Sequence, residues 1–256
     1  MTRYRINPQQ PTAIIVHGLH KSGTMFLYQL FRRVARARKI KYYSSNHLEP
    51  NDQQITSETD HDLCLCPIRS FENKPDSLAD GFDVRRIFQV RDPRDILVSQ
   101  YFSYGWRHTD ESFNAAIYRQ REAIKSMTID EYVLSQQRVL NPLKKRLAQL
   151  TNRKPSPKLT ILKYEEMVLD FPSWLEKAIQ PFNFRVPSLI KKRFSIRYRN
   201  EFQPGNDNKS HKRSVLPGDH LRQLNPETIA RLNEILESEL RSLDYPIISQ
   251  KTATAA

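Results

Sequence analysis

The residues most suited to chemistry lie between Gly18 and Thr24, where a short apolar run ends in a turn that contains Lys21. A strand, a glycine-containing turn and a helix in this order direct backbone N–H groups and a helix N-terminus at one point. The segment therefore predicts an anion site. Its lysine lies inside the turn, whereas the nucleotide-kinase pattern G-x-x-x-x-G-K-[ST] places the lysine after the last glycine.

A second set of candidate phosphate ligands follows another apolar run. Arg85 to Val90 predicts a strand, Arg91 lies at its end, and Ser99 comes eight residues later. Eight residues of helix make about two turns, so the guanidinium and the hydroxyl can face the same side and bind a phosphate. The alternative is that the two aspartates of this run make ordinary helix-start contacts with Arg94.

These two segments resemble signatures of one enzyme family. His20-Lys21-Ser22-Gly23-Thr24 resembles the 5′-phosphosulfate loop of the PAPS-dependent sulfotransferases, and Arg91 to Ser99 resembles their 3′-phosphate motif, R-D-P-R-D-x-x-x-S. Lys163-Tyr164-Glu165-Glu166-Met167 looks like their strand-to-helix Tyr-Glu element. Arg213 to His220 is similar to their late loop, R-K-G-x-x-G-D-W. The resemblance extends from Thr12 to Tyr245.

The sequence also departs from the family pattern. Ser214-Val215 stands where the family often has Lys-Gly, and His220-Leu221 stands where it often has Trp-Lys. The stretch Cys66 to Ser70 contains no histidine, although cytosolic members carry their catalytic histidine in this neighbourhood. The general base is therefore not identified by the motifs.

The resemblance implies transfer of a sulfuryl group from 3′-phosphoadenylyl sulfate (PAPS) to a hydroxyl or amine, with 3′,5′-ADP as product and no metal required. Lys21 is expected at the bridging oxygen, where negative charge develops as the phosphate leaves. The residues expected to bind the nucleotide are Lys21, Ser22, Gly23, Thr24, Met25 and Phe26 at the 5′-phosphate, Arg91, Ser99 and Arg213 at the 3′-phosphate, and Tyr164.

The acceptor must lose a proton to a base, for which a neutral imidazole or a carboxylate is suited. His47 follows the second predicted strand and is the first candidate, with Glu49 close behind it. His108 follows the helix that carries Ser99 and lies near Tyr104 and Trp106, which suggest an aromatic acceptor wall.

Charge and composition limit the other functions. The chain of 256 residues has 41 Lys and Arg against 28 Asp and Glu, a net charge of +13 that favours an anionic partner. A P-loop nucleotide kinase or NTPase and a basic nucleic-acid-binding protein remain the alternatives. The basic run Arg32 to Lys41 is interpreted as a solvated helix face rather than a nucleic-acid surface. The expected partner is a small-molecule, lipid or saccharide acceptor, while the oligomeric state is not predicted.

No apolar stretch near the start is long enough for a signal peptide or a membrane span, which favours a cytoplasmic protein. Cys64 and Cys66, one residue apart, predict a strand with both thiols on one face. They exclude a disulfide framework.

The elements that must position these residues alternate between strands and helices. Strands are predicted at Thr12–His17, Ile40–Tyr43, Asp62–Ile68, Arg85–Val90 and Thr160–Lys163, and helices at Ser22–Arg38, Asp95–Trp106, Tyr164–Asp170, Pro187–Arg199 and Pro226–Leu243, with two more inside Thr109–Gln149. This order predicts an α/β fold, with a central, mostly parallel β-sheet flanked by helices. The resemblance specifies a P-loop-NTPase-like sulfotransferase fold.

We expect one domain over residues 1–256, with a core at 12–245, a polar N-terminal lead-in and a C-terminal tail. Asn200 to Asp219 has little periodicity and reads either as a mobile surface loop or as a basic lid over an anionic ligand.

Overall fold

The computed structural model describes residues 11–44, 61–68, 82–107, 115–135, 139–152, 156–183 and 215–247. They belong to two compact units, each of which is described by itself. The first unit comprises Met1–Val90, Lys154–Lys163 and Pro172–Pro187, and the second comprises Arg91–Arg153, Tyr164–Phe171 and Ser188–Ala256.

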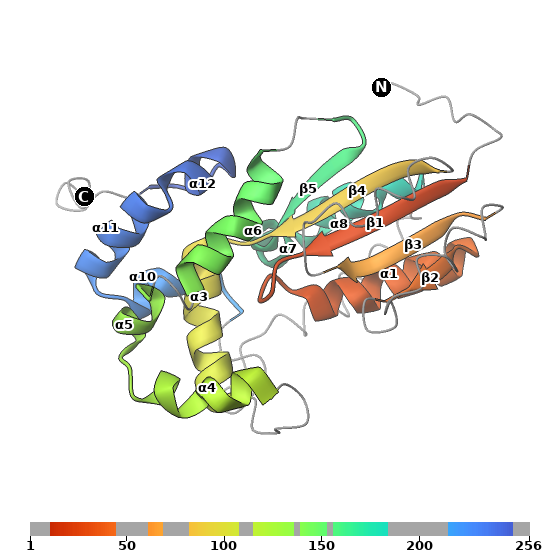
Figure 1. Ribbon diagram of the computed structural model, residues 1–256. Coiled ribbons are helices and arrows are strands. Elements are labelled where there is room, and N and C mark those ends of the chain that lie inside the picture. Colours follow the sequence, from red (N-terminus) through yellow and green to blue (C-terminus); the bar gives the residue numbers. More distant parts are fainter. Residues whose placement is uncertain are drawn as a thin grey trace. The chain divides into compact units, whose positions relative to one another are not determined.

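A five-stranded parallel sheet forms the centre of the first unit (Figure 1). Its strands are β1 (Thr12–Gly18), β2 (Lys41–Tyr43), β3 (Leu63–Ile68), β4 (Asp83–Val90) and β5 (Leu159–Lys163), in the order β2-β3-β1-β4-β5. The central strand β1 pairs with β4 from Thr12 opposite Asp83 to Gly18 opposite Gln89. A strand buried on both faces reads as a continuous apolar run, as Ala13 to Val16 does. The predicted α/β class with a parallel sheet is confirmed.

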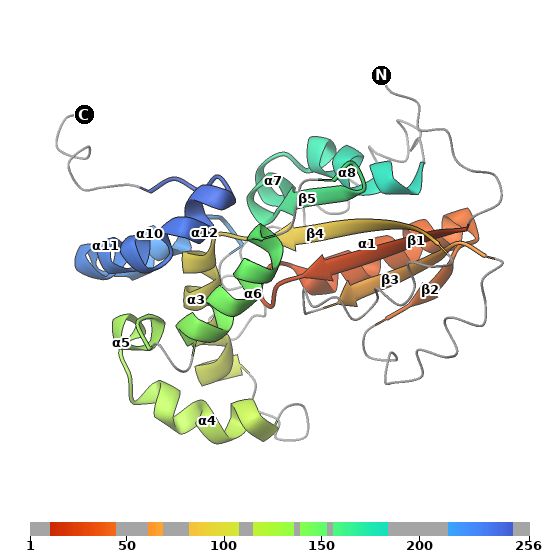
Figure 2. The same ribbon diagram turned by 45° about the horizontal axis from the view of Figure 1, so that its top comes forward.

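Two helices cover one face of this sheet. Helix α1 (Thr24–Arg38) runs along the sheet, as Figure 2 shows, and α8 (Phe171–Ile179) continues into the short η4 (Gln180–Phe182). The rings of Phe26 and Trp174 lie 5.8 Å apart, and those of Phe31 and Phe182 stack at 5.5 Å. These aromatic contacts hold α1 and the α8–η4 segment together.

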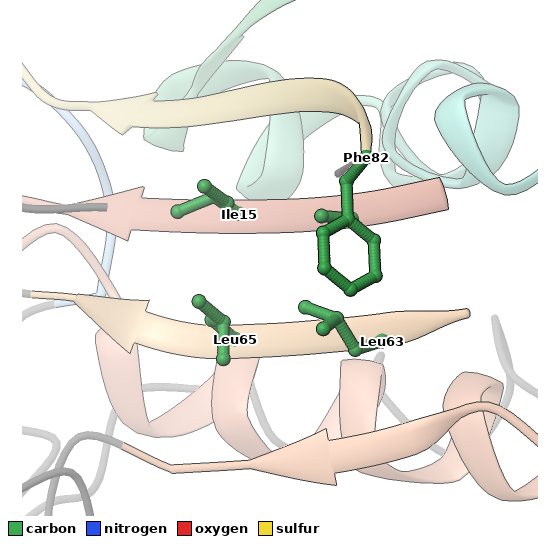
Figure 3. Packing of buried hydrophobic residues seen from close by; sticks show 5 residues of the cluster. Ile15, Leu63, Leu65 and Phe82 are labelled. Atoms are coloured by element: carbon green, nitrogen blue, oxygen red, sulfur yellow. The ribbon is translucent and has the colours of Figure 1, made fainter. Parts of the chain in front are cut away.

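The side chains of β1 and β3 alternate between the two faces of the sheet. Ile15, Leu63, Leu65 and Phe82 form a buried cluster on one face (Figure 3). Cys64 and Cys66 point to the other side, both fully buried, so the predicted strand with two thiols on one face is confirmed. Burial raises the pKa of both thiols well above the usual range.

Helices make up the described part of the second unit. They are α3 (Pro93–Phe102), the π-helical turn η2 (Ser103–Arg107), α4 (Ala115–Lys125), α5 (Ile129–Val133), α6 (Asn141–Thr151), α7 (Tyr164–Leu169), α10 (Asp219–Gln223), α11 (Pro226–Ile235) and α12 (Glu237–Ser242). Thr128 and Glu131 form a capping box at the start of α5.

Several predicted boundaries differ from those observed. α1 begins at Thr24 rather than Ser22, because Gly23 before it has a positive φ of 86°. α3 begins two residues early, with Pro93 in its first turn, and ends at Phe102 where the π-helical turn takes over. The stretch predicted as one helix from Pro226 breaks at Leu236 into α11 and α12. The predicted helix Pro187–Arg199 lies outside the described residues.

No helix among the described residues combines the length and the apolar character needed to span a membrane.

Candidate functional site

The turn between β1 and α1 depends on a close approach of strand and helix. A Cβ atom at Gly18 would lie 2.7 Å from Thr24 Cγ2 and 3.3 Å from Leu27 Cδ1, so only glycine fits at the end of β1 without displacing the helix start. The N–H of Leu19 donates to the carbonyl of Gln89 on the neighbouring strand β4 at 3.4 Å. The turn is therefore fixed to the sheet at its first residue.

Two residues of the turn adopt left-handed backbone conformations. Lys21 has a φ of 71° and Gly23 a φ of 86°. Gly23 tolerates this conformation, whereas a lysine in it costs about 1–2 kcal/mol relative to its preferred regions. Strain at a charged residue in a turn before a helix is typical of ligand sites, where the surrounding structure imposes it.

Ser22 shapes the turn in this structure. Its side chain is fully buried, and its hydroxyl donates to the carbonyl of Leu19 at 2.6 Å and lies 3.3 Å from the carbonyl of Gln89. Its backbone N–H also donates to Leu19, at 3.0 Å. Both donors that the sequence suggested for a phosphate are thus engaged within the turn.

The start of α1 offers the remaining donors. By helix geometry, the N–H groups of Thr24 and Met25, at the first two positions, have no acceptor inside the helix. The N–H of Phe26 already donates to the carbonyl of Gly23 at 2.9 Å. The Met25 side chain is 60% exposed, while the Phe26 ring packs against Trp174. The donors that helix geometry leaves without an intrahelical acceptor at this helix start are therefore the backbone N–H groups of Thr24 and Met25.

The Arg91–Ser99 segment belongs to the second unit, where Asp92 caps α3. The Asp92 carboxylate accepts from the N–H of Arg94 at 2.9 Å and from the Arg94 guanidinium at 2.7 and 3.0 Å. Arg94, only 1% exposed, also donates to Asn233 at 2.6 Å and to the carbonyl of Pro246 at 3.0 Å. Asp92 thus makes the helix-start contact with Arg94 that the alternative interpretation foresaw.

Arg91 lies in different surroundings. Its guanidinium carbon lies 4.3 Å from the centre of the Tyr164 ring, and one of its nitrogens lies 3.6 Å from the Asp95 carboxylate. Ser99 is partly exposed on α3, two turns further along. The structure therefore brings together Arg91 and Tyr164, two of the residues expected to bind the nucleotide.

Asp95 is the acceptor for the segment that precedes α10. Its carboxylate accepts hydrogen bonds from the backbone N–H groups of Gly218 and His220, both at 2.9 Å, and from Nδ1 of His220 at 2.6 Å. Burial alone would raise the pKa of Asp95. The hydrogen bonds from His220 and the charge of Arg91 outweigh burial and lower that pKa to about 2.

Glu165 is a half-buried acid that the sequence reasoning left without a role. It accepts from the N–H of Asp92 at 2.9 Å and from the hydroxyl of Tyr245 at 3.1 Å. Burial raises its pKa above the usual value. The sequence marked this residue only as the glutamate of the Tyr-Glu pair. In the structure it binds the backbone N–H of Asp92, the residue after Arg91.

Four predicted site residues, His47, Glu49, His108 and Arg213, lie outside the described residues. No group of three or more His, Cys, Asp and Glu side chains is placed to hold a metal ion in the part of the chain that the structure describes.

Comparison with known proteins gives a family and a fold. The family model described as sulfotransferase domain matches residues 11–244. The crystal structure of mouse sulfotransferase SULT7A1 complexed with PAP is 17% identical, with 90% of this chain and 84% of that chain covered and a TM-score of 0.66. Retinol dehydratase in complex with androsterone and the inactive cofactor PAP is 14% identical, with 96% and 84% covered and a TM-score of 0.58. A comparison with curated protein sequences finds no match.

Proposed function

Because the chain belongs to the sulfotransferase domain family, we propose that it moves a sulfuryl group from PAPS to a hydroxyl or amine by in-line transfer, with Lys21 at the leaving oxygen. The enzyme class, a PAPS-dependent sulfotransferase, follows from family membership. The observation that carries the residue assignment is the turn Leu19–Gly23, which holds a lysine in a left-handed conformation directly before α1.

Lys21 is assigned by the chemistry of the leaving group. As the bond between sulfur and the bridging oxygen breaks, negative charge grows on a phosphate oxygen, and a cation beside that oxygen stabilises the transition state more than the ground state. A lysine provides a compact charge for one atom. Its place inside the turn supports contact with an oxygen near the strand end.

The 5′-phosphate is assigned to the amide groups at the start of α1. The N–H groups of Thr24 and Met25 have no intrahelical acceptor, and the positive end of the helix dipole favours a dianion there. The Thr24 hydroxyl belongs to the same proposal. Ser22 supports this cradle by fixing the turn to Leu19 and Gln89.

The 3′-phosphate is assigned to Arg91, with Ser99 and Arg213 as further ligands. A guanidinium can donate two parallel hydrogen bonds to a phosphate, which makes arginine suited to a group that must be recognised rather than transferred. Arg91 is 3% exposed and lies over the ring of Tyr164, so its orientation is restricted before any ligand binds.

His47, His108 and Glu49 remain the proposed candidates for the general base, in that order. We propose a small-molecule, lipid or saccharide acceptor. An apolar acceptor has support from the aromatic group at the end of α3, where Trp106 is 43% exposed and its ring lies 4.8 Å from that of Tyr101. The solved retinol dehydratase complex contains androsterone, an apolar alcohol, as its second ligand. We further propose that residues 12–245 act as one sulfotransferase domain.

Thermal unfolding with added nucleotides tests the donor assignment. A ligand that binds only the folded state raises Tm, so 3′,5′-ADP should raise Tm and ATP with Mg²⁺ should not. Arg91→Ala should weaken binding of 3′,5′-ADP much more than binding of 5′-AMP, because only the former carries the group assigned to Arg91. A larger shift with ATP and Mg²⁺ would favour the nucleotide kinase, and equal losses for both nucleotides would remove Arg91 from the 3′-phosphate.

A further inference from the structure

The segment Val215–His220 is attached to the surroundings of Arg91 at two points. The fully buried Asp95 carboxylate accepts hydrogen bonds from the backbone N–H groups of Gly218 and His220, both at 2.9 Å. The hydroxyl of Tyr164 donates to the carbonyl of Val215 at 2.8 Å. The same two side chains, Asp95 and Tyr164, are those that contact the Arg91 guanidinium.

His220 adds a side-chain contact to this arrangement. Its Nδ1 lies 2.6 Å from Oδ1 of Asp95 and therefore carries the hydrogen, because an ionised carboxylate only accepts. Its Nε2 has no hydrogen-bond partner in the described parts of the chain. A histidine oriented by an aspartate is the arrangement of many general bases, but this imidazole is only 3% exposed. Its contact with Asp95 is the interaction that the described residues show for this imidazole.

The two oxygens of Asp95 are thus used unequally. Oδ1 accepts twice from His220, and Oδ2 accepts from Gly218 and lies 3.6 Å from Arg91. Asp95 therefore attracts the guanidinium without binding it through two short hydrogen bonds. Without the imidazole, the backbone N–H groups of Gly218 and His220 would still hold the carboxylate, but Oδ1 would lose its side-chain donor. The less satisfied carboxylate would attract Arg91 more strongly and compete with a phosphate for the N–H groups of the guanidinium.

We propose that His220 is a positioning residue for donor recognition: by holding the Asp95 carboxylate, it keeps the Arg91 guanidinium available to the 3′-phosphate. This inference rests on the proposed function, in which Arg91 binds that phosphate. It assigns a role to His220, a residue at which this sequence departs from the motif it resembles. The role depends on the contact of the imidazole Nδ1 with Asp95.

Calorimetric binding of 3′,5′-ADP and 5′-AMP to the full chain tests the proposal. His220→Ala should weaken 3′,5′-ADP by about tenfold, the effect of one charge-assisted hydrogen bond, and leave 5′-AMP nearly unchanged. His220→Asn should recover most of the loss, because its amide can donate from near the position of Nδ1. His220→Gln, whose amide lies near the position of Nε2, should not recover it.

Arg222→Ala is the matched control. Arg222 donates to the carbonyls of Pro217 and Leu216 in the same segment, at 3.1 and 3.2 Å, and does not contact Asp95. A general loosening of the segment would alter both nucleotides in this variant as well, whereas the proposal expects its affinity ratio to remain that of the wild type.

The outcomes separate the two levels of the argument. If Arg91→Ala loses the preference for 3′,5′-ADP but His220→Ala keeps the wild-type ratio, the inference about His220 is wrong and the donor assignment stands. If the wild type binds the two nucleotides equally, the donor assignment itself fails. If His220→Ala does not fold, the pair His220→Asn and His220→Gln decides, and equal ratios in that pair overturn the proposal.

Discussion

Asp95→Asn should remove a contribution to the free energy of unfolding that depends on pH in the acidic range. The Asp95 pKa falls from 3.8 to about 2 in the folded protein, since the hydrogen bonds from His220 and the charge of Arg91 outweigh the effect of burial. At about 1.4 kcal/mol per pH unit, this interval corresponds to roughly 2 kcal/mol in the free energy of unfolding. Because the folded pKa is the lower one, the contribution is complete above about pH 4 and is lost as the pH falls through about 2.

Urea unfolding of the wild type and the variant at several pH values between 5 and 2 measures this contribution. The difference in their free energies of unfolding should shrink by roughly 2 kcal/mol over this range, because only the wild type loses the ionised carboxylate. Asn233→Ala is the control, since Asn233 accepts from Arg94 in the same unit and does not titrate. A wild-type–variant difference that stays constant from pH 5 to pH 2 would refute the assignment of Asp95 as an ionised acceptor.

Four other predictions concern the turn and the base. Lys21→Ala should reduce turnover by about 10²–10³ with a smaller loss of donor affinity, measured by steady-state kinetics and calorimetry. Lys21→Gly should unfold at a higher temperature than Lys21→Ala, because only glycine is unstrained at a φ of 71°. Gly18→Ala should cost about 1–3 kcal/mol in chemical unfolding, because its Cβ would lie 2.7 Å from Thr24 Cγ2, and an unchanged midpoint would contradict the close approach. His47→Ala should remove the acidic limb of the pH–rate profile while 3′,5′-ADP still binds; if His108→Ala does so instead, the order of the candidates is reversed, and if neither does, Glu49 is tested next.

The strands and the turn before α1 were the most predictable features. All five observed strands overlap predicted ones, because buried parallel strands are short apolar runs bounded by turn residues, and this pattern is local. The family and the enzyme class predicted from the motifs are confirmed by the match over residues 11–244. The turn at Lys21 was found for the same reason, since its residues are adjacent in the sequence.

Helix ends were less predictable because they depend on backbone conformations that composition does not specify. The left-handed Gly23 delays α1, and the π-helical turn at Ser103 ends α3 early. Helix α8 was missed although Phe171, Trp174 and Leu175 have helical spacing and are buried. Its pattern was present in the sequence but followed another predicted helix without a glycine or a clear loop between them.

Long-range polar contacts were the part that no local pattern predicted. Asp95 and His220 are 125 residues apart, and Asp92 and Glu165 are 73 apart. The identity of a charged residue does not indicate with which distant donor it forms a hydrogen bond. In a chain with a net charge of +13, most charged residues are interpreted as solvated surface residues. The sequence therefore singled out Arg91 as a candidate ligand but did not indicate the side chains that contact it.

The charges of the R-D-P-R-D run show how one short motif serves two purposes. Asp92 and Arg94 point into the protein, where the guanidinium bonds the carboxylate and the carbonyl of Pro246. Arg91 and Asp95 form the other pair, in which the carboxylate is held by His220 and contacts the guanidinium only at 3.6 Å. Removing one partner of the first pair leaves a buried charge without its counterion, which destabilises the fold. Disturbing the second pair changes where a guanidinium points, so its effect should appear in nucleotide selectivity rather than in folding alone.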